Sequence, residues 1–277
     1  MRGTAHAHLV ECDDGHAYVV KLPGNPQGTR ILANELIASV LLGEMGIATP
    51  QPAIVQLDCQ ILSANPDVSF HQGNGSNRPR RVVCFGSRFP GCPARVSVFD
   101  MFPRAMLAEL CNRFDFLGAL VVDKWLSNSD SRQAIYFRTA AGRRDGPRWI
   151  AQMIDNGHAF FGSDWLLGDS QLLLGHYPEL AVYGPTPSIR DFEPWIERLR
   201  SVERAVLDQT MDLIPSSWIG EDRDSLQCLL DRLWRRRDLV PSLVEDAVKG
   251  IRERVSRCTG PVLAHLNGLP QSLPAAL

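Results

Sequence analysis

Two acidic residues lie in short polar breaks between apolar stretches, and their spacing points to one kind of chemistry. Asp130 lies in the segment SNSDSR, and Asp155 comes directly after the apolar run WIAQMI. The two are 25 positions apart, and the segments 134–138 and 149–154 between them are strand-like, so a hairpin would hold both carboxylates at a fixed separation. Phosphoryl transfer uses such a pair, because one carboxylate handles the acceptor hydroxyl and the second holds a divalent metal on the nucleotide.

Each aspartate also has a simpler interpretation. Asn, Ser and Asp are common in turns and caps, so Asp130 could be a turn residue. Asp155 precedes the dipeptide Asn156-Gly157 and could begin a tight turn. A metal-binding role suits Asp155, because magnesium is usually held by one or two protein carboxylates together with phosphate oxygens and water. We therefore expect Asp155 to be the metal-holding carboxylate of the pair.

A lysine and a glutamate near the N-terminus could supply the phosphate-binding half of the site. Lys21 ends the alternating segment AYVVK, a predicted strand; taken alone, it is most simply an exposed lysine at a strand end. Glu35 lies between Leu32 and Leu36 on a predicted helix, where an unpaired carboxylate would be costly to bury. A strand lysine followed 14 residues later by a helix glutamate is how a kinase fold directs a cation to nucleotide phosphates.

The N-terminal third of the chain has the pattern of a small β-rich unit. It is predicted to contain a hairpin over 7–22, a helix over about 30–45, and strands over 52–58 and 80–87. The string SRFPGCPAR that follows contains two prolines and a glycine, which cannot continue a strand or a helix, so it is predicted to be a linker.

The remainder of the chain is predicted to be mainly helical. The stretch from Pro103 to Asn128 is apolar around much of its circumference, which predicts a buried helix. Further helices are predicted over 190–209, 222–236, 242–257 and 261–267. Together these patterns predict an α+β fold with two lobes, a β-rich N-lobe over 1–90 and a helical C-lobe over 91–277.

Composition argues against several classes of protein. The net charge of -2 and a pI near 6.4 argue against a dedicated nucleic-acid binder. Seven scattered cysteines without a CxxC pair suit a reducing compartment, and seven histidines form no HxxxH or HExxH pair for zinc. Neither a signal-peptide pattern nor an apolar run of about 20 residues is present. We therefore expect a cytoplasmic protein with neither a membrane segment nor a nucleic-acid partner.

Four short motifs, taken in order, resemble those of a known family. The strand VVK, the helix dipeptide NE, the break NSD-R and the turn IDNG are similar to those of the HipA-like kinases, bacterial serine/threonine kinase relatives that include toxin–antitoxin kinases. The resemblance is to compact members of the family and runs from residue 1 to at least residue 161. It implies a bilobal protein-kinase-like fold, use of ATP and Mg²⁺, and a protein substrate, and it allows for an antitoxin-like partner.

The resemblance also implies a role for each of the four charged residues. Lys21 would bind the α- and β-phosphates of ATP, and Glu35 would hold Lys21 in place. Asp130 would be the catalytic base that accepts the proton of a Ser or Thr hydroxyl. Asp155 would be the metal ligand of the turn after the second strand of the hairpin.

The catalytic loop departs from the family pattern. That pattern is N-x-D-R-H-x-x-N, in which the last Asn binds a second metal ion. Asn128 and Asp130 match its start, but Ile135 stands where the metal-binding Asn is expected. Gln133 or Asn128 could supply the missing oxygen ligand.

The expected phosphate-covering loop departs as well. The segment RGTAHAHL has one glycine and lacks GxGxxG, so only backbone amides near Gly3 and Thr4 could reach a phosphate. Two further functions are compatible with these residues. One is a small-molecule kinase of the aminoglycoside- or lipid-phosphotransferase type, and the other is a nucleotide-binding pseudokinase that acts as a binding module.

Overall fold

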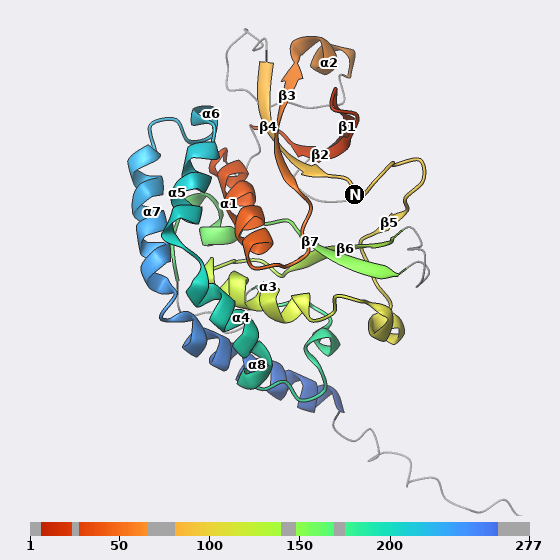
Figure 1. The fold of residues 1–277 in the computed structure, drawn as a ribbon, viewed down its shortest axis with the longest axis vertical. Coiled ribbons are helices and arrows are strands. Elements are labelled where there is room, and N and C mark those ends of the chain that lie inside the picture. The colour runs from red at the N-terminus through yellow and green to blue at the C-terminus, as the bar shows by residue number, and fades with distance from the viewer. Residues whose placement is uncertain (1–6, 24–27, 66–80, 140–147, 169–174, 260–277) are drawn as a thin grey trace, which may run out of the picture.

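A small sheet with one long helix against it is followed along the chain by a mainly helical region (Figure 1). The structure, a computed structural model, describes residues 7–23, 28–65, 81–139, 148–168 and 175–259. The fold is therefore α+β, with a β-rich N-terminal lobe and a larger helical C-terminal lobe, as predicted. The division near residue 90 stays a prediction.

The N-terminal lobe contains a four-stranded antiparallel sheet with the strand order β1-β2-β4-β3. Its strands are β1 (His8–Glu11), β2 (Ala17–Lys21), β3 (Pro52–Asp58) and β4 (Arg81–Arg88). The β1–β2 turn is closed by the Asp14 carboxylate, which accepts hydrogen bonds from the Tyr18 hydroxyl (2.7 Å) and the His16 amide (2.9 Å). Strand β2 lies between β1 and β4, and Lys21 at its end is paired with Phe85 of β4, so the position of Lys21 is fixed by the sheet.

Helix α1 (Arg30–Glu44) is the central element of the molecule, buried on most of its circumference. On one side it packs against β3 and β4 of the sheet. On the other it packs against the C-terminal elements η2 (Ala159–Asp164), α5 (Arg204–Leu213) and α6 (Ser216–Ile219). Polar side chains are buried along with the apolar ones, among them Asn34, Glu35 and Ser39. Such a helix requires polar partners in the second lobe, because buried polar groups are costly unless they are hydrogen-bonded.

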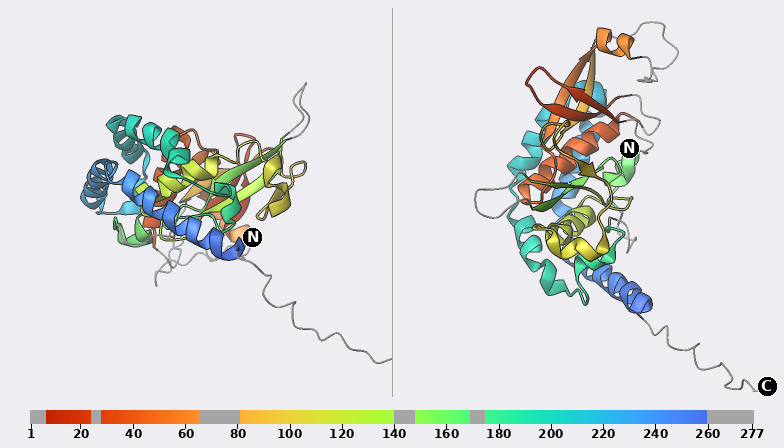
Figure 2. Two further views of the ribbon diagram at one scale, coloured as in Figure 1. Left: turned by 90° about the horizontal axis from the view of Figure 1, so that it is seen from below. Right: turned by 90° about the vertical axis from the view of Figure 1, so that its right-hand side faces the viewer.

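A second, three-stranded sheet lies between the N-terminal sheet and helix α3 (Figures 1 and 2). Its strands are β5 (Val98–Phe99), β6 (Gln133–Arg138) and β7 (Trp149–Ile154), and α3 spans Asp115–Trp125. The antiparallel register places Gln133 opposite Ile154, the residue before Asp155. The predicted hairpin between the two aspartates therefore forms, and Gln133 is brought beside the end of β7.

One short helix, α2 (Cys59–Ala64), lies in the N-terminal lobe beside β3. The other remaining helices cover the outside of the C-terminal lobe (Figure 2); they are η1 (Arg104–Glu109), η3 (Leu180–Tyr183), α4 (Ile189–Ser201), α7 (Arg223–Arg236) and α8 (Val240–Thr259). Helices α4 and α8 pack on α3, so α3 is buried on nearly every side. Within the described residues, no helix combines the length and the apolar character needed to cross a membrane.

The single helix predicted from Pro103 to Asn128 is wrong. The chain instead forms η1, a break, and then α3. In the break, the Asn112 side chain pairs with the backbone of Ala151 on β7, donating to its carbonyl (2.8 Å) and accepting from its amide (3.0 Å). The Cys111 amide also donates to the carbonyl of Trp149 (3.1 Å), so the break is held against β7 instead of continuing as a helix.

The single helix predicted over 190–209 is also divided, into α4 and α5. Val202 has extended backbone angles, φ -58° and ψ 125°, and its buried side chain joins the core, so the chain turns there to bring α5 against α1. The helices predicted over 222–236 and 242–257 are confirmed as α7 and α8. The short helix predicted over 261–267 lies outside the described residues.

Two helical glycines provide a test of this packing. A Cβ atom on Gly118 of α3 would lie 2.6 Å from the Trp195 ring and 3.0 Å from Ile47, whereas a Cβ on Gly43 of α1 would meet nothing within 4 Å. We expect Gly118→Ala to lower the free energy of unfolding by about 1–3 kcal/mol through overpacking. Gly43→Ala should raise it by about 0.5–1 kcal/mol, because alanine favours the helix. Urea denaturation measures both, and a stabilising Gly118→Ala would contradict the close packing of α3 on α4.

Candidate active site

Three of the charged residues singled out in the sequence meet at one point. The Lys21 ammonium forms ion pairs with Glu35 on α1 and with Asp155 after β7, the latter at 2.8 Å. The Glu35 side chain is 2% exposed, that of Lys21 13% and that of Asp155 29%. Lys21 thus joins the glutamate of the first lobe to an aspartate that lies 134 positions after the lysine.

The electrostatics of this cluster favour a permanently charged lysine. Burial alone would lower the pKa of Lys21, but Glu35 and Asp155 outweigh it and hold that pKa above its ordinary value. Burial would likewise raise the pKa of Asp155, but the neighbouring Lys21 outweighs it and keeps that pKa below its ordinary value. Lys21 and Asp155 therefore both stay charged near neutral pH, and the site presents a fixed cation beside an ionised carboxylate.

The turn at Asp155 has an unusual backbone. Asp155 adopts φ +59°, in the left-handed region, directly after the last residue of β7. The next amide, that of Asn156, donates a 3.0 Å hydrogen bond to the second oxygen of Glu35. Glu35 therefore binds Lys21 with one oxygen and the turn with the other, which fixes the Asp155 side chain relative to Lys21.

Gln133 contributes an amide group to the same cluster. It is the first residue of β6, and its Nε2 donates a 2.9 Å hydrogen bond to Oδ2 of Asp155. Its side chain is exposed, in contrast to that of Asn128. The structure therefore places the Gln133 amide at the Asp155 carboxylate, where a metal ligand was expected.

Asn128 has a different environment. It is 3% exposed, its Nδ2 donates to Oδ1 of Asp123 (2.9 Å), and its Oδ1 accepts from the backbone amide of Asp130 (3.1 Å). The half-buried Asp130 carboxylate accepts a 2.7 Å bond from the Ser131 amide. Asn128 thus fixes the loop that carries Asp130, and its amide does not bond to Asp155, although both lie in the described part of the chain.

A buried ion pair behind the site was missed in the sequence. Arg132 and Asp123 have side-chain exposures of 1% and 0%, and the guanidinium binds both carboxylate oxygens, one of them at 2.9 Å from Nε. Nη1 of Arg132 also donates to the carbonyl of Ile154 (3.1 Å) and to Oδ1 of Asn156 (2.7 Å). The pair connects the end of α3 with both sides of the Asp155 turn. Asp123 could have been found, since a carboxylate inside LGALVVDKWL requires a partner when buried.

Two of the expected site residues, Gly3 and Thr4, lie outside the described residues. Among the residues that are described, no group of three His, Cys, Asp or Glu side chains is arranged to hold a metal ion. Any metal bound here would therefore need oxygen atoms from other sources, such as the Gln133 amide or a bound phosphate.

The chain matches no family model and no curated protein by sequence. Among solved structures it is similar to a Helicobacter pylori proinflammatory kinase, CtkA, at 11% identity and a TM-score of 0.49, with 91% of each chain covered. It is also similar to hydra Fam20 with sugar (13% identity, TM-score 0.48, covering 90% of this chain and 83% of that one). A third is the Golgi casein kinase (10% identity, TM-score 0.44, covering 90% and 71%). Similarity at this level supports no statement about activity, and membership of the HipA-like family stays a prediction.

The buried Asp123–Arg132 pair can be compared with an exposed one. Asp123→Asn leaves the Arg132 guanidinium buried without a counter-charge, so we expect the free energy of unfolding to fall by about 3–5 kcal/mol. The control is Asp208→Asn, which breaks the exposed Arg204–Asp208 pair on α5 and should cost about 1 kcal/mol or less. Denaturation with guanidinium chloride measures both. Equal losses would mean that Arg132 finds another partner or reaches water.

Proposed function

We propose that the chain is an ATP- and magnesium-dependent kinase that transfers the γ-phosphate of ATP to a Ser or Thr hydroxyl of a protein, in the manner of the HipA-like kinases. The observation that carries the proposal is the contact of Lys21 with both Glu35 and Asp155. A lysine fixed by a helix glutamate, beside an aspartate at the end of a strand, is the arrangement that kinases use to hold nucleotide phosphates and their metal.

The two carboxylates around Lys21 have different roles in this proposal. Glu35 is almost fully buried and also binds the Asn156 amide, so it is the permanent partner that fixes Lys21. Asp155 is more exposed, and within the described part of the chain its carboxylate accepts hydrogen bonds from two side chains, those of Lys21 and Gln133. Asp155 is therefore the carboxylate that can turn to a metal ion, while Lys21 binds the phosphates.

The oxygen ligands available suit magnesium. Mg²⁺ is usually bound by one or two carboxylates, completed by phosphate oxygens and water, so three protein ligands are not required. Asp155 would hold the ion, and Gln133 would supply a second oxygen after rotation of its amide. When bound, the ion neutralises charge on the phosphates. We assign Asn128 a positioning role instead, because its amide already holds Asp123 and the Asp130 backbone.

Asp130 is proposed as the base of the transfer step. Its carboxylate would accept the proton of the acceptor hydroxyl as the hydroxyl oxygen bonds to the γ-phosphorus. The bond between that phosphorus and the bridging oxygen breaks, and ADP leaves. The fixed loop geometry supports this role, since Asn128 and the Ser131 amide hold Asp130 on both sides.

The direct test is incubation with γ-labelled ATP, magnesium and a cell lysate. We expect label on proteins, at Ser or Thr. Label on a small molecule would mean that the chain is a small-molecule kinase, and bound ATP without transfer would identify a pseudokinase.

Asp130→Asn should lower transfer by about 100- to 10,000-fold while nucleotide affinity is kept, because the base contacts the hydroxyl only. Asp155→Asn should remove the metal dependence of ATP binding. Full transfer by folded Asp130→Asn protein would disprove its role.

The Lys21–Glu35 pair predicts non-additive losses. Lys21→Met and Glu35→Gln should each lower kcat/KM by about 100-fold or more, as removal of one preorganised charge at a reacting group does. The kcat/KM of the double variant should be little lower than that of the less active single variant, because the effects of residues that act as one unit are not additive. Lys249→Met, which alters an exposed lysine on α8, is the control and should have normal activity. Additive losses would show that the two side chains act separately.

A further inference from the structure

One buried asparagine has all of its hydrogen-bonding groups directed at the segment that follows Asp155. Asn34 on α1 is 0% exposed. The two hydrogens of its Nδ2 are shared among three backbone carbonyls, those of Gly157 (3.0 Å), Ala159 (3.0 Å) and Gly162 (2.8 Å). Its Oδ1 accepts from the indole nitrogen of Trp165 (2.9 Å). A single side chain thus holds four points of a nine-residue segment, 157–165.

This segment has an unfavourable backbone. Between Asp155 and Trp165, non-glycine residues with φ between 54° and 59° are Asp155, Phe160, Phe161 and Trp165. The left-handed region is disfavoured for each such residue, so a segment that contains several of them keeps its shape only where its surroundings enforce it. Asn34 provides this enforcement from inside the molecule.

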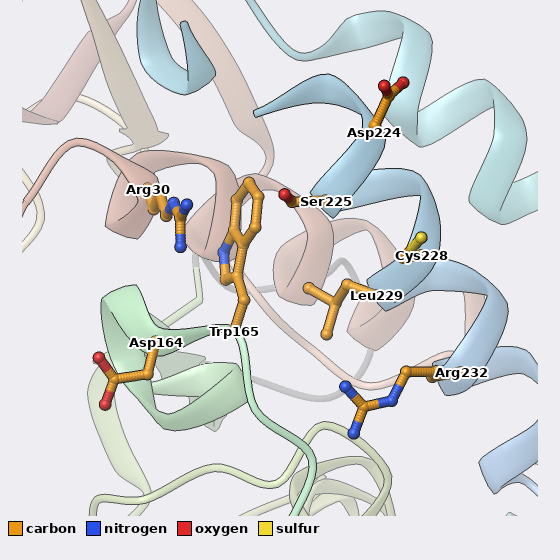
Figure 3. Close-up of a pocket in the computed structure, with 8 residues that line it drawn as sticks. All are labelled: Arg30, Asp164, Trp165, Asp224, Ser225, Cys228, Leu229 and Arg232. Atoms are coloured by element: carbon orange, nitrogen blue, oxygen red, sulfur yellow. The ribbon is translucent and has the colours of Figure 1, made fainter. Parts of the chain in front are cut away.

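A second residue of α1 holds the same segment from outside. Arg30 lies one turn before Asn34 on the helix, and its Nη1 donates to the carbonyl of Ser163 (3.0 Å) while its guanidinium lies 4.4 Å from the centre of the Trp165 ring. Arg30 and Trp165 line a pocket of about 400 Å³ together with Leu229 and other residues of α7 (Figure 3). Asn34 is not among the lining residues, so the inner hydrogen bonds are protected from water.

Glu35, the residue next to Asn34 on α1, links the Asn34 hydrogen bonds to the site. Glu35 binds Lys21 and the Asn156 amide, and Asn34 binds the chain from Gly157 onward. Two adjacent helix residues therefore hold consecutive parts of the turn that begins at Asp155. A displacement of α1 would break both sets of bonds together, so the positions of Glu35 and Asp155 are coupled.

We propose that Asn34 is a positioning residue that locks segment 157–165 onto α1 and thereby keeps Glu35 and Asp155 in the arrangement needed for transfer. The effect on catalysis rests on the proposed kinase function. The lock itself is a property of the folded chain and can be measured without a substrate.

The experiment compares amide hydrogen exchange and kcat in full-length variants. Asn34→Leu keeps a similar side-chain volume but removes all four hydrogen bonds. Trp165→Phe removes one bond and should fold even if Asn34→Leu does not. Asn65→Leu, at an exposed asparagine in the N-terminal lobe, is the matched control and should change neither measurement.

For Asn34→Leu we expect exchange of amides in 157–165 to rise more than 10-fold while α8 stays protected, and kcat to fall by at least a similar factor at saturating ATP. For Trp165→Phe we expect a rise of about fivefold, the effect of one ordinary hydrogen bond. Unchanged exchange of 157–165 in either folded variant would overturn the lock. Increased exchange with normal kcat would overturn its catalytic role. If the wild-type protein transfers no phosphate, the proposed function fails, while the exchange result still decides the lock.

Discussion

The Glu35 carboxylate is the contact on which the rest of the site depends. It is nearly inaccessible to water and binds the Lys21 ammonium from the first lobe and the Asn156 amide from the second, 121 positions away in sequence. A buried carboxylate is stable only when its oxygens are paired, so neither partner can leave without a large desolvation cost. Helix α1 therefore cannot settle in another position without exposing this charge or leaving it unpaired, so the first lobe is held in a defined position on the Asp155 turn.

A second buried charge pair supports the same turn from the opposite side. Arg132 and Asp123 have almost no exposure, and Arg132 also binds the backbone of Ile154 and the side chain of Asn156. Asn156 is thus held by Glu35 at its backbone amide and by Arg132 at its side-chain oxygen. Because these bonds come from different elements, α1 and the loop before β6, the turn at Asp155 is fixed by two independent supports. Preorganisation of this kind is what the proposed phosphoryl transfer would require.

The parts of the site that could be predicted from the sequence are charged residues that lie in otherwise apolar strands and helices. Lys21 and Glu35 stood out as charges in apolar elements, and the structure brings them together. The hairpin between the two aspartates was predicted from the strand-like runs 134–138 and 149–154, which are local signals, and it forms with Gln133 as the first residue of β6. The break at Asn112 could not be predicted, because its cause is a hydrogen bond to Ala151, 39 positions later. Gln133 could be placed only through the β6–β7 register, which sets it opposite Ile154.

The left-handed conformation of Asp155 shows how local propensity yields to the site. Glycine would adopt φ +59° without strain, but glycine offers no carboxylate. The reversal of the chain at this residue lets the side chain reach Lys21 while the next amide reaches Glu35. An extended residue there would direct one of these groups away from α1. The strain of about 1 kcal/mol is offset by bonds that exist only in this conformation. This conformation, which brings the carboxylate to Lys21, supports the proposed metal-binding role of Asp155.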